Sequence, residues 1–205
     1  GLLFGLVMSV VSNLFVITVK AATGLREGYV ADLLAIGDSG LTLAPLVCLI
    51  VTAVIVVWIR TALGIGRWHG PADSIYAAHR TDNELDIRAG FGSTLAALIS
   101  AGGGASVGQY GPLVHFGATM GSALRQISRR FLTTDVFVGC GVADAIAAGF
   151  NAPIAGMVFA HEAILRHFSL RAIAPIAVAS ISSYWFSERF FGSAFSSSAS
   201  RQRSA

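Results

Sequence analysis

The sequence predicts an all-α integral membrane protein with broken and tilted helices. Hydrophobic residues make up 54% of its 205 residues, charged residues make up 12%, and the mean hydropathy is +0.69. A soluble globular domain carries about 25% charged residues, so this chain has too little polar surface to cover a water-soluble globule. Because no basic run is interleaved with aromatic residues, we expect the lipid bilayer, and not nucleic acid, as its partner.

Two long apolar stretches predict membrane-spanning helices early in the chain. Residues 2–19 carry no charge and approach the length of about 20 residues that a helix needs to cross the hydrocarbon. Neither a basic leading region nor a small-residue cleavage site frames this stretch, which argues against a signal peptide. Residues 41–59 are also uncharged, and Arg60 follows them.

After Arg60 the apolar segments become shorter and are interrupted by glycine and proline. The pattern predicts helices over residues 71–79, 89–101, 112–124, 136–150, 153–165 and 171–186. Short helices that begin at proline are typical of transporter folds whose half-helices end near the middle of the membrane. We therefore assign residues 1–192 to a transmembrane region. Residues 193–205 form a serine-rich tail, which we expect to be disordered or to be the end of a fragment.

Residues 102–112 combine five glycines with a proline. Glycine permits backbone conformations that other residues resist, and Pro112 suits the first turn of a helix. The segment therefore predicts non-helical chain that leads into a helix N-terminus, where free N–H groups and the positive end of the helix dipole would face an anion. A tight turn between two packed helices is the alternative.

A second motif, residues 147–162, reads A-A-G-F-N-A-P-I-A-G-M-V-F-A-H-E, with Asn151 placed to cap a helix that Pro153 begins. Residues 108–112 read G-Q-Y-G-P. Together they resemble the G-[KR]-E-G-P and A-A-F-N-A-P-[LI]-A-G-x-x-F-x-x-E motifs of the CLC family of chloride channels and chloride/proton antiporters. The resemblance covers about residues 41–191, which correspond to the N-terminal one of the family's two inverted repeats.

The resemblance implies a fold and an anion site. In CLC proteins two such repeats pack antiparallel, each subunit encloses its own pore, and two subunits form a homodimer. Chloride is the transported ligand, no other cofactor is implied, and helix N-termini converge on it. By position, the backbone of Gly108, Gln109, Tyr110 and Gly111 would face the anion here. Backbone coordination needs no particular side chain.

Tyr110 is the first departure from the family pattern, because it occupies the position of the gating glutamate. The unperturbed pKa of tyrosine is about 10, so its side chain stays neutral and cannot mimic an anion as a carboxylate does. Its hydroxyl group could donate a hydrogen bond to chloride, or its ring could narrow the pore. A packing role for the ring is the alternative.

The second departure is the loss of a carboxylate that carries protons in the family's antiporters. Glu162 matches the first of two adjacent glutamates, whereas Ala163 takes the place of the second. We therefore predict no stoichiometric chloride/proton exchange. Asp144 lies in an otherwise apolar helix, where it would face the pore, pair with an arginine such as Arg166, or form a structural hydrogen bond. Glu162 would either handle protons or bridge helices.

The family's G-S-G-I-P element, whose serine contacts the central chloride, is the third departure. Aligning the prolines places Trp68 at that serine and leaves Gly70-Pro71 as the conserved part. Trp68, His69 and Gly70 are therefore candidate anion ligands. His69 would add a titratable donor near the inner mouth of the pore, unless it is an ordinary loop histidine.

Other residue patterns give weaker signals. His161-Glu162 and His167 do not form a zinc motif, because the histidines are six residues apart instead of four. With no catalytic triad, phosphate-binding loop or metal cluster either, we do not expect an enzyme. Cys48 and Cys140 are expected to be buried as small hydrophobic residues. Gly117-x-x-x-Gly121 predicts close helix packing within the subunit.

The function expected from these observations is passive chloride conduction by a CLC-type pore, in a homodimer of the inner membrane of a bacterium. A second repeat would complete the pore. One alternative is an anion antiporter whose proton path uses Asp144, Glu162 or water. A different alternative is a non-conducting membrane scaffold.

Overall fold

The computed structural model describes residues 2–25, 35–36, 41–79, 85–106, 108, 110–127, 133–167 and 169–202. In chain order the elements are α1 (Leu2–Leu25), β1 (Ala35–Ile36), β2 (Leu41–Thr42), α3 (Ala44–Leu63), α4 (Pro71–His79), α5 (Ile87–Gly102), α6 (Tyr110–Ile127), α7 (Thr134–Phe150), α8 (Pro153–Phe159), η3 (Ala160–Leu165) and α9 (Leu170–Gln202). The two strands form one short antiparallel pair, and helices make up nearly everything else, as expected for an all-α protein.

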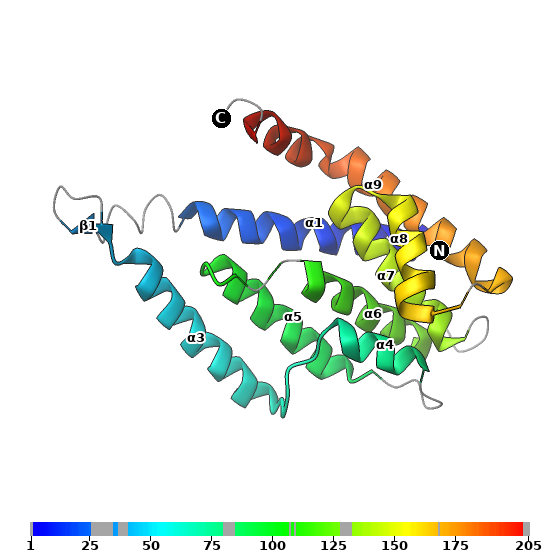
Figure 1. Ribbon diagram of the computed structural model, residues 1–205, viewed down its shortest axis with the longest axis horizontal. Helices are drawn as coiled ribbons and strands as arrows, with labels where there is room; N and C mark the ends of the chain where they lie inside the picture. The colour runs from blue at the N-terminus through cyan, green and yellow to red at the C-terminus, as the bar shows by residue number, and fades with distance from the viewer. Residues whose placement is uncertain are drawn as a thin grey trace.

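Two of the described helices are long and apolar enough to cross a membrane. They cover Gly5–Leu25 of α1 and Pro45–Leu63 of α3, with mean hydropathies of 1.7 and 2.5. The α1 window is 41% buried within the protein, whereas the α3 window is only 6% buried. Figure 1 shows α3 leaning away from the other helices, with α5 as its main neighbour. Nearly all of the α3 surface is therefore left uncovered by the other described helices.

The centre of the fold is the crossing of α6 and α7. A Cβ atom added to Gly117 would collide with the carbonyl oxygen of Gly141, and one added to Gly141 would collide with that of Gly117. Gly121 meets the carbonyl oxygen of Phe137 in the same way. The two backbones are thus in direct contact, which confirms that the Gly117-x-x-x-Gly121 pattern packs within the chain.

Helix α7 is buried along almost its whole length, between α6 on one side and α1 and α9 on another. Figure 1 shows α9 running obliquely across the bundle as its outer layer. The helix continues to Gln202, so it includes most of the serine-rich segment, for which the sequence analysis expected disorder or the end of a fragment. The physical reason is that residues 193–202 contain neither proline nor glycine to end a helix.

The break between α7 and α8 lies at Asn151, whose backbone is left-handed with φ of 56°. Asn151 was expected to cap α8, but it is the C-terminal cap of α7, and α8 has no side-chain cap. Asparagine is one of the few residues that tolerate this conformation, and the proline two residues later cannot continue a helix. The helix that begins at Pro153 passes into the π-helical turn η3 and ends at Arg166, with φ of 54°.

Candidate anion site

The connection from α5 to α6 has the glycine-dependent turns that the sequence predicts. Gly104 and Gly108 have φ values of 96° and 71°, which L side chains rarely adopt. No atom lies within 4 Å of a Cβ built on Gly108, so this glycine is needed for its backbone conformation and not for space. Helix α6 then begins at Tyr110, two residues before Pro112. Gln109 lies outside the described residues.

Tyr110 is packed against the end of α7. Its ring stacks on Phe150, with centroids 3.8 Å apart and planes inclined by 26°. Both rings remain partly exposed, at 39% and 49%. They line a cavity of about 420 Å³, the apolar cavity, whose other walls are Pro71, Gly111, Val114, Ile146, Ala152, Ala155 and Phe159. Of the roles considered for Tyr110, packing is therefore realised, while its ring still faces open space.

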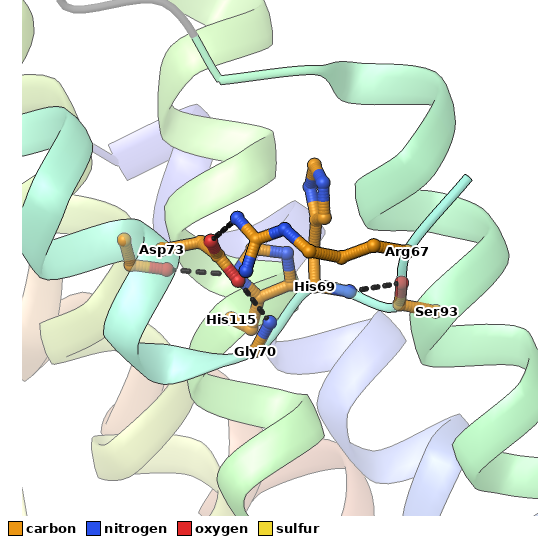
Figure 2. A network of polar contacts seen from close by, with 7 residues as sticks. Arg67, His69, Gly70, Asp73, Ser93 and His115 are labelled. Carbon is orange, nitrogen blue, oxygen red and sulfur yellow. Dashed lines mark hydrogen bonds and ion pairs between the residues drawn. The ribbon is translucent and has the colours of Figure 1, made fainter. Parts of the chain in front are cut away.

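The loop before α4 uses its backbone N–H groups within the protein. The N–H of His69 donates to Ser93 Oγ at 2.9 Å, and the N–H of Gly70 donates to Asp73 Oδ2 at 2.8 Å. Figure 2 shows Asp73 between Gly70 and the guanidinium of Arg67, with which it forms an ion pair. Two of the candidate anion ligands, His69 and Gly70, thus have backbone donors that are already engaged, which leaves only the imidazole of His69 available.

Asp73 stabilises the first turn of α4. Its carboxylate accepts a hydrogen bond from the Gly70 N–H at 2.8 Å and forms an ion pair with the guanidinium of Arg67. The carboxylate reaches back to the residue that precedes the helix, as the third residue of a capping box does. Asp73 therefore fixes the conformation of the 68–70 loop.

We expect Asp73→Ala to lower the stability of the protein by about 1 kcal/mol, because the Gly70 N–H loses its acceptor. Arg67→Ala should have a smaller effect, since the Arg67 side chain is 70% exposed and such ion pairs contribute little. Thermal unfolding in detergent measures both changes. Glu162→Ala is the control, because Glu162 is exposed and its loss should leave the midpoint nearly unchanged. A fall as large for Glu162→Ala as for Asp73→Ala would contradict this role.

A second cavity, the polar cavity, has a volume of about 240 Å³ and lies between the 68–70 loop, α5 and α6. Its lining residues are Val56, Trp68, His69, Gly70, Pro71, Ser93, Thr94, Ala96, Ala97, Ser100, Pro112 and His115. The sequence analysis did not single out His115. Its position one turn after Pro112 was the available signal, because that spacing places it beside the start of α6.

His115 is held by α4 and faces His69. Its Nδ1 is 2.8 Å from Ser74 Oγ, and its ring is edge-on to that of His69 with centroids 6.2 Å apart. Only 1% of His115 is exposed. Among the described residues, His115 Nε2 and His69 Nδ1 are buried and have no hydrogen-bond partner.

Five of the seven predicted ligands thus lie around Pro71. Pro71 lines both cavities, with Trp68, His69 and Gly70 in the polar cavity and Tyr110 and Gly111 in the apolar one. A Cβ atom on Gly111 would lie 3.6 Å from Pro71 Cγ, so the starts of α4 and α6 meet at this point. Two helix N-termini with partly open surroundings are therefore brought together.

The two carboxylates named from the sequence lie elsewhere. Glu162 is exposed on η3, and Asp144 is completely buried in α7, and neither lines either cavity. Both carboxylate oxygens of Asp144 lack a hydrogen-bond partner among the described residues, so neither the pairing with Arg166 nor the structural hydrogen bond, two of the three roles considered, is found. The exposed position of Arg166, beyond the end of η3, is the physical reason. The backbone oxygen of Asp144 accepts a hydrogen bond from Ser183 Oγ at 3.1 Å.

Within the described ranges no three histidine, cysteine, aspartate or glutamate side chains come together as metal ligands would. The fold and the site instead define a helical membrane protein whose short helices start beside one another around open space. That class of architecture includes ion-transporting proteins with broken helices.

Comparison with known proteins gives the family. The family described as "Voltage gated chloride channel" matches residues 67–204, which is more than half of the chain. This match includes the loop before α4 and everything after it. The chain therefore belongs to the voltage-gated chloride channel family, as the two motifs predict.

Several curated relatives support this assignment. A protein of Ralstonia nicotianae described as ClcB-like and as a chloride channel protein is 31% identical over 128 residues, 60% of this chain and 30% of the relative. The voltage-gated ClC-type chloride channel ClcB of Yersinia pseudotuberculosis is 29% identical over 112 residues, 55% of this chain and 27% of the relative. ClcB of Shigella flexneri is 28% identical over 115 residues, with coverages of 56% and 27%. The chain spans less than a third of the length of these relatives.

Proposed function

We propose that this chain forms the N-terminal half of a CLC-type pore that conducts chloride passively. The anion-facing part is the start of α6, where the left-handed backbone at Gly108 leads into the helix. The first N–H groups of a helix have no partner within it, and the helix dipole adds positive potential at the same end. The proposal draws on the names of the relatives, which describe those proteins as chloride channels.

The observation that carries passive conduction is the Tyr110–Phe150 stack. A neutral tyrosine cannot compete with chloride as a carboxylate would, and its ring contacts Phe150 with centroids 3.8 Å apart. Stacked aromatic pairs contribute about 0.5–1.5 kcal/mol beyond the burial of their area, so this contact favours one position of the ring. With Ala163 beside Glu162, both positions of the family's proton-handling carboxylates lack an acid.

Family membership supports the rest of the proposed assembly. The relatives are more than three times as long as the matched segments, which leaves room for a second repeat that contributes its own helix ends to the site. We propose a homodimer in which each subunit encloses one pore, situated in the inner membrane of a bacterium. No cofactor other than the transported anion is needed.

Flux measurements on the full-length protein in liposomes test this proposal. We expect chloride efflux whose rate follows the chloride gradient and is the same with and without an imposed proton gradient. Protein-free liposomes give the background. Proton uptake driven by a chloride gradient would replace the proposal by the antiporter, and an efflux equal to the background would replace it by a non-conducting scaffold.

The same flux measurement should include variants of Asp144, because this residue is completely buried and its carboxylate has no hydrogen-bond partner among the described residues. Ionisable groups of this kind inside membranes often belong to proton paths. If the full-length protein does couple chloride to protons, Asp144→Asn should remove the coupling and Glu162→Gln should not. Coupling that survives Asp144→Asn would assign the proton path to Glu162 or to water.

A further inference from the structure

The apolar cavity is large enough for an organic molecule. Its walls come from α4, α6, α7, α8 and the turn between α7 and α8, which are separate elements of the chain. Its volume of about 420 Å³ falls within the range of about 300–1,000 Å³ that is usual for small-molecule sites. The enclosed space is therefore much larger than a single small ion requires, and the size of the cavity suits an organic ligand.

Three of the side chains that line this cavity are aromatic and only partly covered. Tyr110 and Phe159 are each 39% exposed, and Phe150 is 49% exposed. The rings of Tyr110 and Phe150 are inclined by only 26°, so the pair forms a nearly flat apolar wall. Covering apolar surface removes it from water, and ring-on-ring packing adds a further attraction that depends on geometry. A planar aromatic molecule fits such a wall better than a branched or saturated one.

The lining of the apolar cavity favours a neutral ligand. Among the lining residues that the structure describes, none has a charged side chain, and the hydroxyl group of Tyr110 is the only polar side-chain group. A charged molecule in this space would lose water and gain no side chain of opposite charge, whereas a neutral ring loses little. Apolar cavities bind small aromatic molecules such as benzene for the same reason.

We propose that the apolar cavity is a binding site for a neutral, planar aromatic molecule, which packs against Phe150 and Phe159 and inhibits chloride conduction. Binding depends only on the cavity itself. The inhibition rests on the proposed function, because Tyr110 and Gly111 belong both to the cavity wall and to the segment that we expect to face the anion. A molecule in the cavity would stand beside that segment and hinder the passage of chloride.

Crystals of the full-length protein soaked with 1-bromonaphthalene test the binding. The anomalous scattering of bromine locates the probe, and we expect a peak in the apolar cavity. An excess of naphthalene should remove this peak. Decalin, the saturated counterpart of naphthalene, should leave it in place, because decalin is neither planar nor aromatic. The proposal is wrong if the rest of the full-length chain fills the cavity, if no peak appears there, or if decalin removes the peak as well as naphthalene does.

Two neighbouring substitutions on α8 form a matched pair for this experiment. Ala155 lines the cavity and is exposed, so Ala155→Trp should fill the space and abolish the bromine peak. Ile154→Trp is the control, because Ile154 is 76% exposed and does not line the cavity. It places the same side chain one residue away and should retain the peak. A full peak in Ala155→Trp would contradict the proposed site.

Chloride efflux from liposomes tests the inhibition separately. Naphthalene should lower the efflux, and Phe159→Ala should require about tenfold more naphthalene for the same fractional inhibition, since it loses one aromatic wall. Each variant is compared with its own efflux without naphthalene. Equal sensitivity of Phe159→Ala and the unchanged protein would refute the inhibition. A protein that binds the probe in crystals but conducts no chloride would refute the proposed function and leave the binding site intact.

Discussion

Gly141→Val should lower the stability of the protein by at least about 3 kcal/mol, the upper part of the range for overpacked cores. The new side chain would be forced against the backbone carbonyl of Gly117, and the reverse contact exists at Gly117 itself. Side chains can adopt other rotamers to relieve a collision, but a helix backbone can move only as a whole. Separating α6 from α7 would also displace the start of α6, where the proposed anion site lies.

Thermal unfolding of the full-length protein in detergent measures this loss of stability, with size-exclusion chromatography as the readout of the folded fraction after each heating step. The control is Gly24→Val, because no atom lies within 4 Å of a Cβ at Gly24. It replaces the same residue by the same side chain near the end of an early helix, and we expect its midpoint to match the wild type within the equivalent of about 0.5 kcal/mol. Equal midpoints for the two variants would show that the α6–α7 contact is looser than described.

Tyr110→Glu should convert a pH-insensitive pore into a pH-gated one. The unperturbed pKa of glutamate is about 4.3, so its side chain is charged at pH 7.5 and competes with chloride for the start of α6. If the carboxylate makes the free energy of chloride binding less favourable by about 1.4 kcal/mol, chloride binding becomes roughly tenfold weaker. We expect the chloride flux at this pH to fall by the same factor. Below the pKa the side chain becomes neutral, so the flux should return toward the wild-type value as the pH falls to about 4.

Two matched variants separate the effect of the new carboxylate from the effect of losing the tyrosine. Tyr110→Phe keeps the ring that stacks on Phe150 and removes only the hydroxyl group, so its flux should remain close to wild type at both pH values. Phe150→Leu keeps the tyrosine and removes the stack, and it tests whether the ring position matters. If Tyr110→Phe lowers the flux as much as Tyr110→Glu, then the hydroxyl group is an anion ligand and the competition argument is wrong.

The helices begun by proline were predictable from the sequence almost to the residue. Helix α4 occupies Pro71–His79 as expected, and the helical segment of α8 and η3 spans the predicted residues 153–165. Proline has a fixed φ and no N–H, which makes it a strong start signal. Helix ends without such signals were less accurate. Helix α1 continues past Lys20 to Leu25, because an exposed lysine at the end of an apolar stretch does not interrupt a helix.

The unusual backbone before α6 could be predicted, but the side chains that surround it could not. The glycines before α6 by themselves indicate a left-handed backbone conformation, since few other residues adopt φ values near 71°. The contact between Ser74 and His115 joins residues 41 positions apart, and the stacking of Tyr110 on Phe150 joins different helices. Such contacts depend on how helices cross, and a hydrophobic pattern specifies a buried face without naming the residue opposite it.

The isolation of α3 has a consequence for how the protein enters the membrane. Its spanning window, Pro45–Leu63, carries one charged residue, Arg60, near its end, so this helix can partition into lipid without help from the other helices. Helix α7 differs, because a charged residue at the centre of a single helix opposes insertion by about 2.5–3.5 kcal/mol, and Asp144 occupies such a position. We therefore expect the isolated α3 segment to insert into a bilayer by itself, and the isolated α7 segment to insert less well than an Asp144→Asn variant of it.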